Sequence, residues 1–330
     1  QKEEILEKNE ELQQQKEEIS SQRDEIEKQR DIATRQRDEL SLRKKEITDS
    51  ITYAKNIQKA ILQNEIILNK FSVIDNFILL KPRDIVSGDF YWVKQINWKS
   101  KKKLLIAAAD CTGHGVPGAF MSMLGTAFLN EIFNKYLDPQ KNELELSAAE
   151  ILNQLRDLVI LSLHQSYDIK NKGAFSSVSI KDGMDIALCI LDLETFELQF
   201  AGANNPIYVS SSHGTMIQSN GTMLTEIKGD KQPIGIHENM RPFTNNILQL
   251  NSEDTFYIFS DGYADQFGGP KGKKFMYKRF KNLLETIQNK TMFEQKNILN
   301  QTFESWRGTT FYVDDVLVMG FKINNKEGIN

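Results

Sequence analysis

Four aspartates, each set in its own short motif, constrain this chain more than any other feature of its sequence. Asp110, Asp261 and Asp314 each follow an apolar run typical of a buried strand, and Asp89 lies in the string Ser-Gly-Asp-Phe. A carboxylate at the end of a buried strand is costly unless it is paired or holds a cation. One Asp-Gly alone would indicate only a turn. The ordered set, with few basic residues beside it, favours a site for hard divalent metals such as magnesium or manganese.

The segments around these aspartates carry a family resemblance from residue 70 to the C-terminus. Residues 81–91 (Lys-Pro-Arg-Asp-Ile-Val-Ser-Gly-Asp-Phe-Tyr) and 109–119 (Ala-Asp-Cys-Thr-Gly-His-Gly-Val-Pro-Gly-Ala) resemble the first two motifs of bacterial phosphatases of the stage-II-sporulation-E and sigma-B-regulator type. These enzymes form a branch of the metal-dependent PP2C (PPM) serine/threonine phosphatases. Later family landmarks are matched by residues 201–206 (Ala-Gly-Ala-Asn-Asn-Pro), 232–235 (Gln-Pro-Ile-Gly), 259–262 (Phe-Ser-Asp-Gly) and 314–315 (Asp-Asp).

The resemblance implies the fold and the chemistry of residues 69–330. The family fold is α+β, a four-layer sandwich in which two antiparallel sheets pack face to face between helix pairs. The implied reaction is hydrolysis of a phosphoserine or phosphothreonine by a water that two Mn²⁺ or Mg²⁺ ions activate. Two cations about 3.5 to 4 Å apart can share a water, lower its pKa and neutralise the phosphoryl oxygens. No Cys, Ser or His nucleophile is then required.

Matching the motifs residue by residue implies the metal ligands. Asp110 would bridge both metals, and the backbone carbonyl of Cys111 would complete one metal shell. Asp261 and Asp314 would hold the other metal, and Asp89 would coordinate it directly or through water. Asp110 and Asp89 are therefore the expected catalytic residues, and all five residues are expected metal ligands.

Three residues beside the motifs each keep two interpretations. His114 either acts as a general acid or stabilises its glycine-rich turn through hydrogen bonds. Arg83 either binds the substrate phosphate or forms a structural ion pair. Asp315 either orients Asp314 from outside the metal shell or is itself a ligand.

The composition indicates a globular enzyme, because 40% of the 330 residues are hydrophobic and 26% are charged. The net charge of −4 argues against nucleic acid as a partner. Cys111 and Cys189 have no metal spacing, and we expect reduced thiols in a cytoplasmic protein. No apolar run approaches the roughly 18 to 20 residues of a membrane span. The chain opens within a periodic helix, so we expect a sensor or a membrane tether upstream.

Residues 1–48 carry a heptad repeat without Pro or Gly, which predicts a left-handed coiled coil. The second seam position is polar in either heptad frame, so each heptad should contribute little stability. A parallel homodimer that shifts between states is the favoured interpretation, and a single solvated helix is the alternative. The apolar series is Ile5, Leu12, Ile19, Ile26, Ala33, Leu40 and Ile47.

Residues 49–68 continue the helix with a denser apolar face and are predicted to be a linker or switch helix. This face should pack on the catalytic domain, on a second copy of the helix, or on both. In the proteins that the chain resembles, such a helix couples an upstream sensor to the active site. The alternative is a helix that only seals the domain edge. The face comprises Ile51, Ala54, Ile57, Ile61, Leu62 and Ile66.

The remaining residues predict short strands in hairpin-like succession with helices in pairs, which argues against a doubly wound parallel sheet. Ser-, Lys- and Gly-rich residues 167–183 and 211–223 are interpreted as loops near the active site or a partner. Strands are expected at 74–80, 89–96, 103–109, 184–191, 197–201, 207–210, 247–250, 255–259 and 316–323. Helices are expected at 116–136, 147–166, 274–288 and 292–306.

The sequence therefore predicts a protein phosphoserine/phosphothreonine phosphatase that is controlled through its N-terminal coiled coil. The resemblance implies a phosphorylated protein substrate such as an anti-sigma-factor antagonist. One alternative is a pseudophosphatase that binds a phosphoprotein without hydrolysing it, although all four aspartates are present. Another is a nucleotide cyclase, which the string Ser87-Gly88-Asp89-Phe90 superficially resembles, but Asp261 and Asp314 would then be unexplained.

Overall fold

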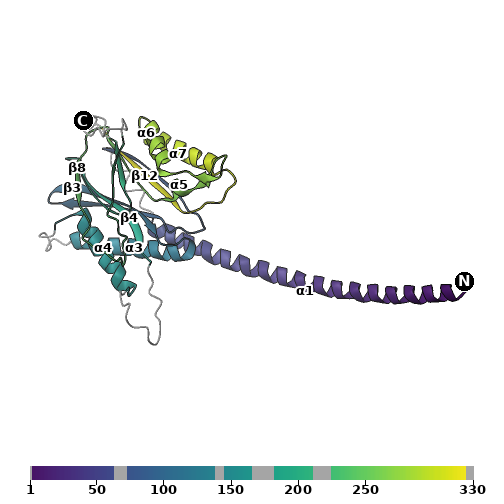
Figure 1. Cartoon of the computed structure of the whole chain (residues 1–330). Helices are drawn as coiled ribbons and strands as arrows, with labels where there is room; N and C mark the ends of the chain where they lie inside the picture. Colours follow the sequence, from purple (N-terminus) through teal and green to yellow (C-terminus); the bar gives the residue numbers. More distant parts are fainter. Residues whose placement is uncertain (1, 63–72, 138–144, 166–181, 211–223, 325–330) are drawn as a thin grey trace. The chain divides into compact units, whose positions relative to one another are not determined.

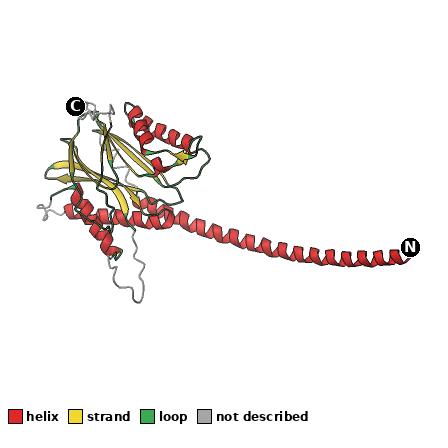
Figure 2. Cartoon of the chain, viewed as in Figure 1, coloured by secondary structure: helices red, strands yellow, loops and turns green. Residues whose placement is uncertain are grey.

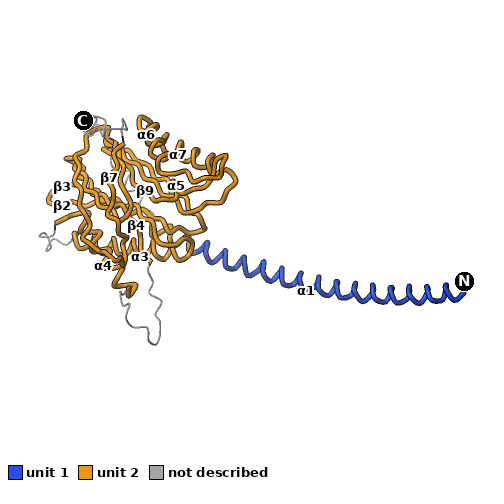
Figure 3. The backbone as a smooth tube through the Cα atoms, viewed as in Figure 1, with its two compact units in different colours: residues 1–53 blue, residues 54–330 orange. Residues whose placement is uncertain are grey.

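The computed structural model describes residues 2–62, 73–137, 145–165, 182–210 and 224–324. Ile66, the expected loop 211–223 and most of the expected loop 167–183 lie outside these residues. The chain divides into two compact units, residues 1–53 and 54–330 (Figure 3). The boundary between the units falls inside the segment 49–68, and the three-part division at 48 and 68 stays a prediction.

Helix α1 (Lys2–Leu62) begins in the first unit and ends in the second. Its first part is stabilised by side-chain pairs one turn apart, such as Arg43 with Glu39 at 2.6 Å. The large apolar residues of the heptad series, Ile5 to Ile47, are between 59% and 69% exposed in the single chain. A long N-terminal helix is confirmed, and its pairing with a second copy remains a prediction. Neither α1 nor any other described helix combines the length and apolar character of a membrane span.

The second unit contains two five-stranded sheets whose strand pairs are all antiparallel (Figure 2). In order, the first sheet comprises β1 (Ile74–Lys81), β12 (Val316–Ile323), β9 (Thr255–Phe259), β6 (Ile207–Ser210) and β7 (Leu224–Ile227). The second comprises β2 (Phe90–Trp98), β3 (Lys101–Cys111), β4 (Met184–Asp192), β5 (Glu197–Ala203) and β8 (Asn246–Gln249).

Helix pairs cover the outer faces of the two sheets (Figure 1). Helices α3 (Gly115–Tyr136) and α4 (Ala148–Ser162) bury their apolar faces on the second sheet. Helices α6 (Tyr277–Ile287) and α7 (Met292–Arg307) pack on the first sheet. Between the sheets lies a core of alternating strand residues, in which the rings of Phe256 and Phe321 stack at 4.9 Å. The predicted four-layer α+β sandwich is confirmed.

Four short elements are absent from the sequence-based prediction. They are β7, helix α5 (Gly262–Asp265), and the hairpin of β10 (Phe267–Gly268) with β11 (Lys273–Lys274). All have at most four residues, too few to show a hydrophobic period. Helix α6 begins at Tyr277 instead of residue 274, because Met276 has a φ of 76° and does not continue a helix.

Antiparallel pairing brings all four aspartates to strand ends. Asp89 directly precedes β2 and Asp110 is near the end of β3, and these ends adjoin because Phe90 pairs with Ala109. Asp261 follows β9 after one residue, and Asp314 lies two residues before β12, which pairs with β9. The two sheets thus each contribute two aspartates.

Candidate metal centre

Asp89 lies at the junction of the two sheets and is only 2% exposed. Its carboxylate accepts a hydrogen bond of 2.5 Å from the hydroxyl of Ser260, the residue before Asp261. The same hydroxyl accepts a hydrogen bond of 2.9 Å from the amide of Leu317 in β12. Ser260 therefore ties the first-sheet motif to Asp89 in the second sheet.

Asp315 holds the loop that precedes Asp89, which we call the first-motif loop (residues 82–89). One carboxylate oxygen accepts from the amide of Arg83 and the other from the amide of Gly88, both at 2.7 Å. The side chain is 2% exposed. Because both oxygens already accept backbone hydrogen bonds, Asp315 fits the positioning role better than that of a ligand.

A second attachment of the first-motif loop comes from α1. The side-chain amide of Gln58 donates to the carbonyl of Ser87 at 2.6 Å, and its oxygen accepts from the amide of Ser87 at 3.2 Å. The same amide donates to the hydroxyl of Ser122 in α3 at 2.9 Å. Gln58 is 5% exposed, although most of α1 faces solvent. The helix end is thus bonded to the backbone two residues before Asp89.

The denser apolar face expected in residues 49–68 is only partly buried. Leu62 is buried in the core that the second sheet forms with α3 and α4, whereas Ile57 and Ile61 remain 42% and 41% exposed. Leu62 and Gln58 are therefore the buried residues at this end of α1, and packing of the exposed isoleucines on a second copy stays a prediction.

Asp110 and Cys111 end β3 next to the first-motif loop. A side-chain carbon placed on Gly88 would meet the carbonyl of Gly113 at 2.8 Å and that of Cys111 at 3.5 Å. Gly88 therefore permits the close approach of the two loops. The thiol of Cys111 is buried, and burial raises its pKa well above the usual value, so it stays protonated. Only the backbone carbonyl of Cys111 can supply an oxygen ligand.

Asp261 is followed by a glycine that no other residue can replace without movement. A side-chain carbon on Gly262 would lie 1.9 Å from the carbonyl oxygen of Asp315. Helix α5 starts at this glycine, and the amides of Ala264 and Asp265 bond back to the carbonyl of Asp261. The close approach places the Ser-Asp-Gly turn directly against the Asp314-Asp315 segment.

The prediction of a buried strand before Asp314 is wrong, because residues 311–313 form no strand and Phe311 is 91% exposed. This segment is held by Gln266, which is fully buried. Its side-chain nitrogen donates to the carbonyl of Phe311 at 3.0 Å, and its oxygen accepts from the amide of Val313 at 3.2 Å. Gln266 directly follows α5, so its amide fixes the approach to Asp314 relative to the element that carries Asp261.

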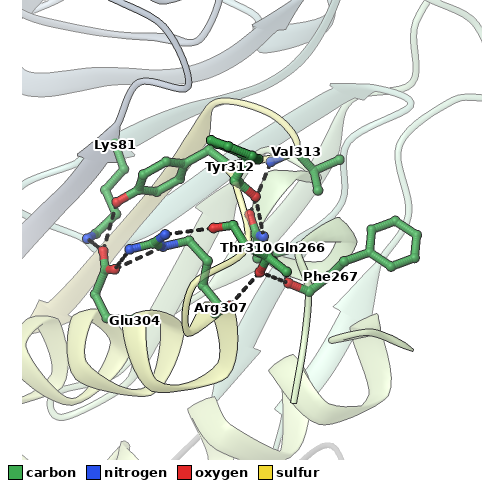
Figure 4. A network of polar contacts seen from close by, with 9 residues as sticks. Lys81, Gln266, Phe267, Glu304, Arg307, Thr310, Tyr312 and Val313 are labelled. Carbon is green, nitrogen blue, oxygen red and sulfur yellow. Dashed lines mark hydrogen bonds and ion pairs between the residues drawn. The ribbon is translucent and has the colours of Figure 1, made fainter. Parts of the chain in front are cut away.

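A polar network continues from this segment to β1 (Figure 4). Glu304 of α7 pairs with Lys81, accepts from the Tyr312 hydroxyl at 2.9 Å and accepts from Arg307 at 2.8 and 3.1 Å. Arg307 also donates to the carbonyl of Thr310 at 2.7 Å. The network fixes both ends that lead into the site, β1 before the first-motif loop and residues 310–312 before Asp314.

Negative charge accumulates where these elements meet. Burial raises the pKa of Asp110 to about 8, with further contributions from the charges of Asp261, Asp314 and Asp185. Burial and the charge of Asp314 raise the pKa of Asp261 to about 6. Burial raises the pKa of Asp89 as well, and Asp110 adds to that effect. These carboxyl groups act on one another, so a cation between them would relieve their repulsion.

The donor set fits a hard divalent ion, because it consists of carboxylate and carbonyl oxygens. Within the described residues, however, no three His, Cys, Asp or Glu side chains converge closely enough to hold one ion. The two observations are compatible. Charges influence one another over about 4 to 6 Å or more, whereas magnesium needs its ligands at about 2.0 to 2.1 Å. The ligand assignment therefore remains a prediction for the residues at this site.

The structure gives His114 and Arg83 partners. The His114 ring nitrogen Nδ1 lies 2.9 Å from the carboxylate of Asp84, which joins the second motif to the first-motif loop, and both side chains are nearly half exposed. The Arg83 guanidinium donates to the carbonyl of Val313 at 2.8 Å. Both contacts favour structural roles over general acid catalysis and phosphate binding.

Comparison with known proteins agrees with this arrangement. A model of the family described as stage II sporulation protein E (SpoIIE) matches residues 100–324. The chain belongs to the SpoIIE family. No curated protein sequence matches it.

Solved structures with the same fold include other members of this class. The SiaA-PP2C domain of Pseudomonas aeruginosa is 29% identical with a TM-score of 0.68, covering 85% of this chain and 98% of that one. The PP2C domain of SpoIIE from Bacillus subtilis, with a fragment of its regulatory domain, is 18% identical with a TM-score of 0.53, covering 76% and 63%. The RsbU and RsbW domains of a Mycobacterium tuberculosis protein are 16% identical with a TM-score of 0.53, and the match covers 76% of this chain and 60% of that one. The chain therefore has the fold of PP2C-type serine/threonine phosphatases.

Sequence reasoning missed three residues of this SpoIIE-family site. Asp185 pairs with Asp110 across β3 and β4 and accepts from Asn204 at 2.8 Å. The only sequence signal for Asp185 is an acid placed before an apolar run. Gln58 and Gln266 lie in no recognisable motif. Each acts through hydrogen bonds to backbone groups that are distant in sequence, and the sequence does not show these partners.

Proposed function

We propose that this protein is a metal-dependent phosphatase that hydrolyses phosphoserine or phosphothreonine in a protein substrate. Membership of the SpoIIE family and the four aspartates support this. The observation that supports it most is the mutual electrostatic effect of these aspartates, because the charge of a neighbour raises the pKa of Asp89, Asp110 and Asp261. Asp89, Asp110, Asp261, Asp314 and the Cys111 carbonyl would hold two Mn²⁺ or Mg²⁺ ions. When bound, these ions would lower the pKa of a water and neutralise the phosphoryl oxygens.

The residues of this chain would supply the geometry of the reaction. Asp110 and Asp89 would orient the ions relative to the phosphoryl group, and they are the residues that we assign to catalysis. Ser260 and Asp315 would keep Asp89 and its loop in place through hydrogen bonds of 2.5 and 2.7 Å. Asp89 itself is shielded from bulk water, because it is only 2% exposed.

The test is hydrolysis of p-nitrophenyl phosphate and of a phosphoserine peptide with and without Mn²⁺. Asp110→Asn should lower kcat at least about a thousandfold, because electrostatic stabilisation of the transition state is commonly the largest single contribution to catalysis. Cys111→Ala should retain turnover, because only the carbonyl is used. Wild-type turnover by Asp110→Asn would exclude this function, and binding of a phosphopeptide without any hydrolysis would favour the pseudophosphatase alternative.

We further propose that α1 controls this activity. Gln58 supports the proposal, because it bonds to both backbone groups of Ser87 in the first-motif loop. The exposed heptad positions and the exposed Ile57 and Ile61 support a parallel homodimer through α1. Light scattering that gives a monomer at tens of micromolar, with unchanged activity after removal of residues 1–46, would contradict this control.

The expected cellular setting follows from the cysteines. Cys111 and Cys189 are both buried and free. Free thiols are usual in a reducing compartment, so we propose that this domain works in the cytoplasm. A phosphorylated anti-sigma-factor antagonist is the substrate that we propose, and in vitro dephosphorylation of such a protein with a phosphate-release assay tests it.

A further inference from the structure

A short segment beside the candidate metal centre is strongly basic. Residues 266–281 contain six Lys or Arg and no Asp or Glu, in a chain whose net charge is −4. The segment forms the β10–β11 hairpin and the start of α6. Such a concentration of one charge in an otherwise acidic protein sets the local potential.

Three of the six cations have partners within the protein. Lys274 pairs with Asp265 at 2.7 Å, the Arg279 guanidinium lies 4.5 Å from the ring centre of Trp306, and the Lys281 ammonium lies 5.6 Å from that of Tyr208. The other three, Lys271, Lys273 and Lys278, are exposed, and no ion pair to them is found among the described residues. Their charge is therefore directed to solvent or to a partner.

The start of α6 shows that this charge is not there to stabilise the helix. Its first turn holds Lys278 and Arg279 and no acidic residue. Acidic side chains are the favourable ones at a helix N-terminus. Helix α7 follows that preference, with Glu294 in a complete capping box. The cations of α6 thus oppose the helix dipole and need another explanation.

Exposed apolar side chains accompany the lysines. Phe311 is 91% exposed, more than any other large apolar side chain of the described residues, and Met276 is 57% exposed. Phe267, which is 41% exposed, has its backbone beside that of Phe311, because Gln266 donates to the carbonyls of both residues. Aromatic side chains and methionine are enriched in protein-binding surfaces.

The surface is rigid and adjoins the metal centre. The amides of Phe275 and Met276 donate to the carbonyls of Gln266 and Ala264. Gly268 and Gly269 approach Trp306 so closely that a side-chain carbon on either would lie within 3.0 Å of it. Helix α5 leads directly back to Asp261, so the hairpin begins six residues after a candidate metal ligand.

We propose that Lys271, Lys273 and Lys278, with Phe267, Met276 and Phe311, form a docking surface for an acidic segment of the phosphoprotein substrate. This inference rests on the proposed phosphatase function and adds the charge of the substrate to it. A phosphoprotein segment with acidic residues is strongly negative, because its phosphate group alone carries about −1.5 to −2 charges. A basic surface beside the candidate metal centre attracts such a segment and orients it.

The test compares two phosphoserine peptides that differ only in flanking residues, acidic in one and lysine in the other. With Mn²⁺, the wild-type protein should show a kcat/KM about tenfold higher for the acidic peptide, mostly through a lower KM. The difference should be no larger than this, because each exposed charge pair contributes little to binding. Raising the salt from about 0.05 to about 0.5 M should reduce the difference, because screening weakens exposed charge pairs.

The double variant Lys271→Glu/Lys273→Glu should abolish or reverse the preference for the acidic peptide. The matched control is Lys101→Glu/Lys102→Glu, which changes the net charge equally. Lys102 lies eight residues from Asp110 along β3, at about 3.3 Å per residue, and this control should keep the preference. A wild-type preference for the lysine peptide, no preference, or an unchanged preference in the double variant would overturn the proposal.

Binding separates failure of this inference from failure of the phosphatase function. Fluorescence anisotropy with the unphosphorylated acidic peptide requires no hydrolysis, and the wild-type protein should bind it more tightly than the double variant does. Equal binding overturns the docking surface even if the wild-type protein hydrolyses p-nitrophenyl phosphate. If the double variant instead loses only its binding to vesicles of anionic lipid, the surface faces a membrane and the proposal is wrong.

Discussion

The first-motif loop has two attachments of different character, one from Asp315 and one from Gln58. Asp315 is a buried carboxylate that accepts from the amides of Arg83 and Gly88 at 2.7 Å. Gln58 is a neutral amide that bonds to Ser87 at 2.6 and 3.2 Å. Hydrogen bonds to a charged group are roughly twice as strong as neutral ones. The two attachments therefore differ in strength as well as in origin.

Their supporting elements differ even more. Asp315 directly precedes β12, which pairs with β1 over eight residues and with β9 on its other side. Gln58 belongs to α1, in which only Gln58 and Leu62 are buried among the described residues. The Asp315 attachment is part of the folded core, whereas the Gln58 attachment depends on two side chains of one helix. If α1 moves, the first-motif loop therefore loses its hydrogen bonds to Gln58 but keeps those to Asp315.

The largest effect should come from Asp315→Ala. The amides of Arg83 and Gly88 would lose their acceptor inside the protein, and each buried amide left without a partner costs about 1 to 3 kcal/mol of unfolding free energy. Urea unfolding followed by tryptophan fluorescence measures it, since Trp92, Trp98 and Trp306 all lie in the catalytic domain. Asp315→Asn keeps one acceptor oxygen and should lose less. A loss below about 1 kcal/mol for Asp315→Ala would mean that the two attachments do not differ.

A smaller loss should follow from Gly262→Ala. The new carbon would lie 1.9 Å from the carbonyl of Asp315, so the segment must move. Overpacking of this kind costs about 1 to 3 kcal/mol. The matched control is Gly272→Ala, whose added carbon meets no atom within 4 Å, although its φ of 57° strains any side chain slightly. Equal stability of Gly262→Ala and the wild-type protein would contradict the tight contact.

The variant Gln58→Leu should separate activity from stability. We expect a loss of about 1 kcal/mol in unfolding free energy, because water can reach Ser87 once the helix moves away. Turnover should fall about tenfold, since 1.4 kcal/mol at the transition state corresponds to that factor. Asn56→Leu, an exposed change on the same helix, is the control for helix propensity and should leave turnover unaltered. A Gln58→Leu protein with normal turnover would show that α1 does not position the loop.

The smallest effect concerns Glu304, which lies outside both attachments. Its hydrogen bonds with Lys81, Arg307 and Tyr312 lower its pKa to about 2 despite partial burial. A lowered pKa stabilises the folded state at pH values above the pKa of the unfolded state, which is about 4.3 for Glu. This stabilisation is lost as the pH falls toward 2. Because the pair is partly exposed, the gain at pH 7 should be below about 1 kcal/mol. The stability difference between the wild-type protein and Glu304→Gln should therefore shrink between pH 5 and pH 3, and a constant difference would contradict this.

The sequence predicted the parts of this structure that depend on local patterns. The strands 207–210, 255–259 and 316–323 have the expected bounds, because Pro, Ser, Asp or Asn flanks each of these runs. The four aspartate motifs could be recognised because each is short and contiguous, and their role as metal ligands stays a prediction. Gln266 and Gln58 were not found, because the carbonyl and amide groups that they bind lie 29 to 47 residues away. The side of α1 that contacts the catalytic domain was also not predictable, since a polar residue, Gln58, makes that contact beside Leu62.

The pairing of β1 with β12 has a consequence for how the protein is made. Ile74 pairs with Ile323, so β1 can form this pairing only after β12 has been synthesised. Asp314 and Asp315 lie just before the same late strand, and chains fold as they are synthesised from the N-terminus. A ribosome-bound chain that has not yet released β12 therefore lacks one of the four aspartates of the candidate metal centre, and its first-motif loop is not yet held by Asp315. For the phosphatase that we propose, the order of synthesis itself would keep the unfinished protein inactive.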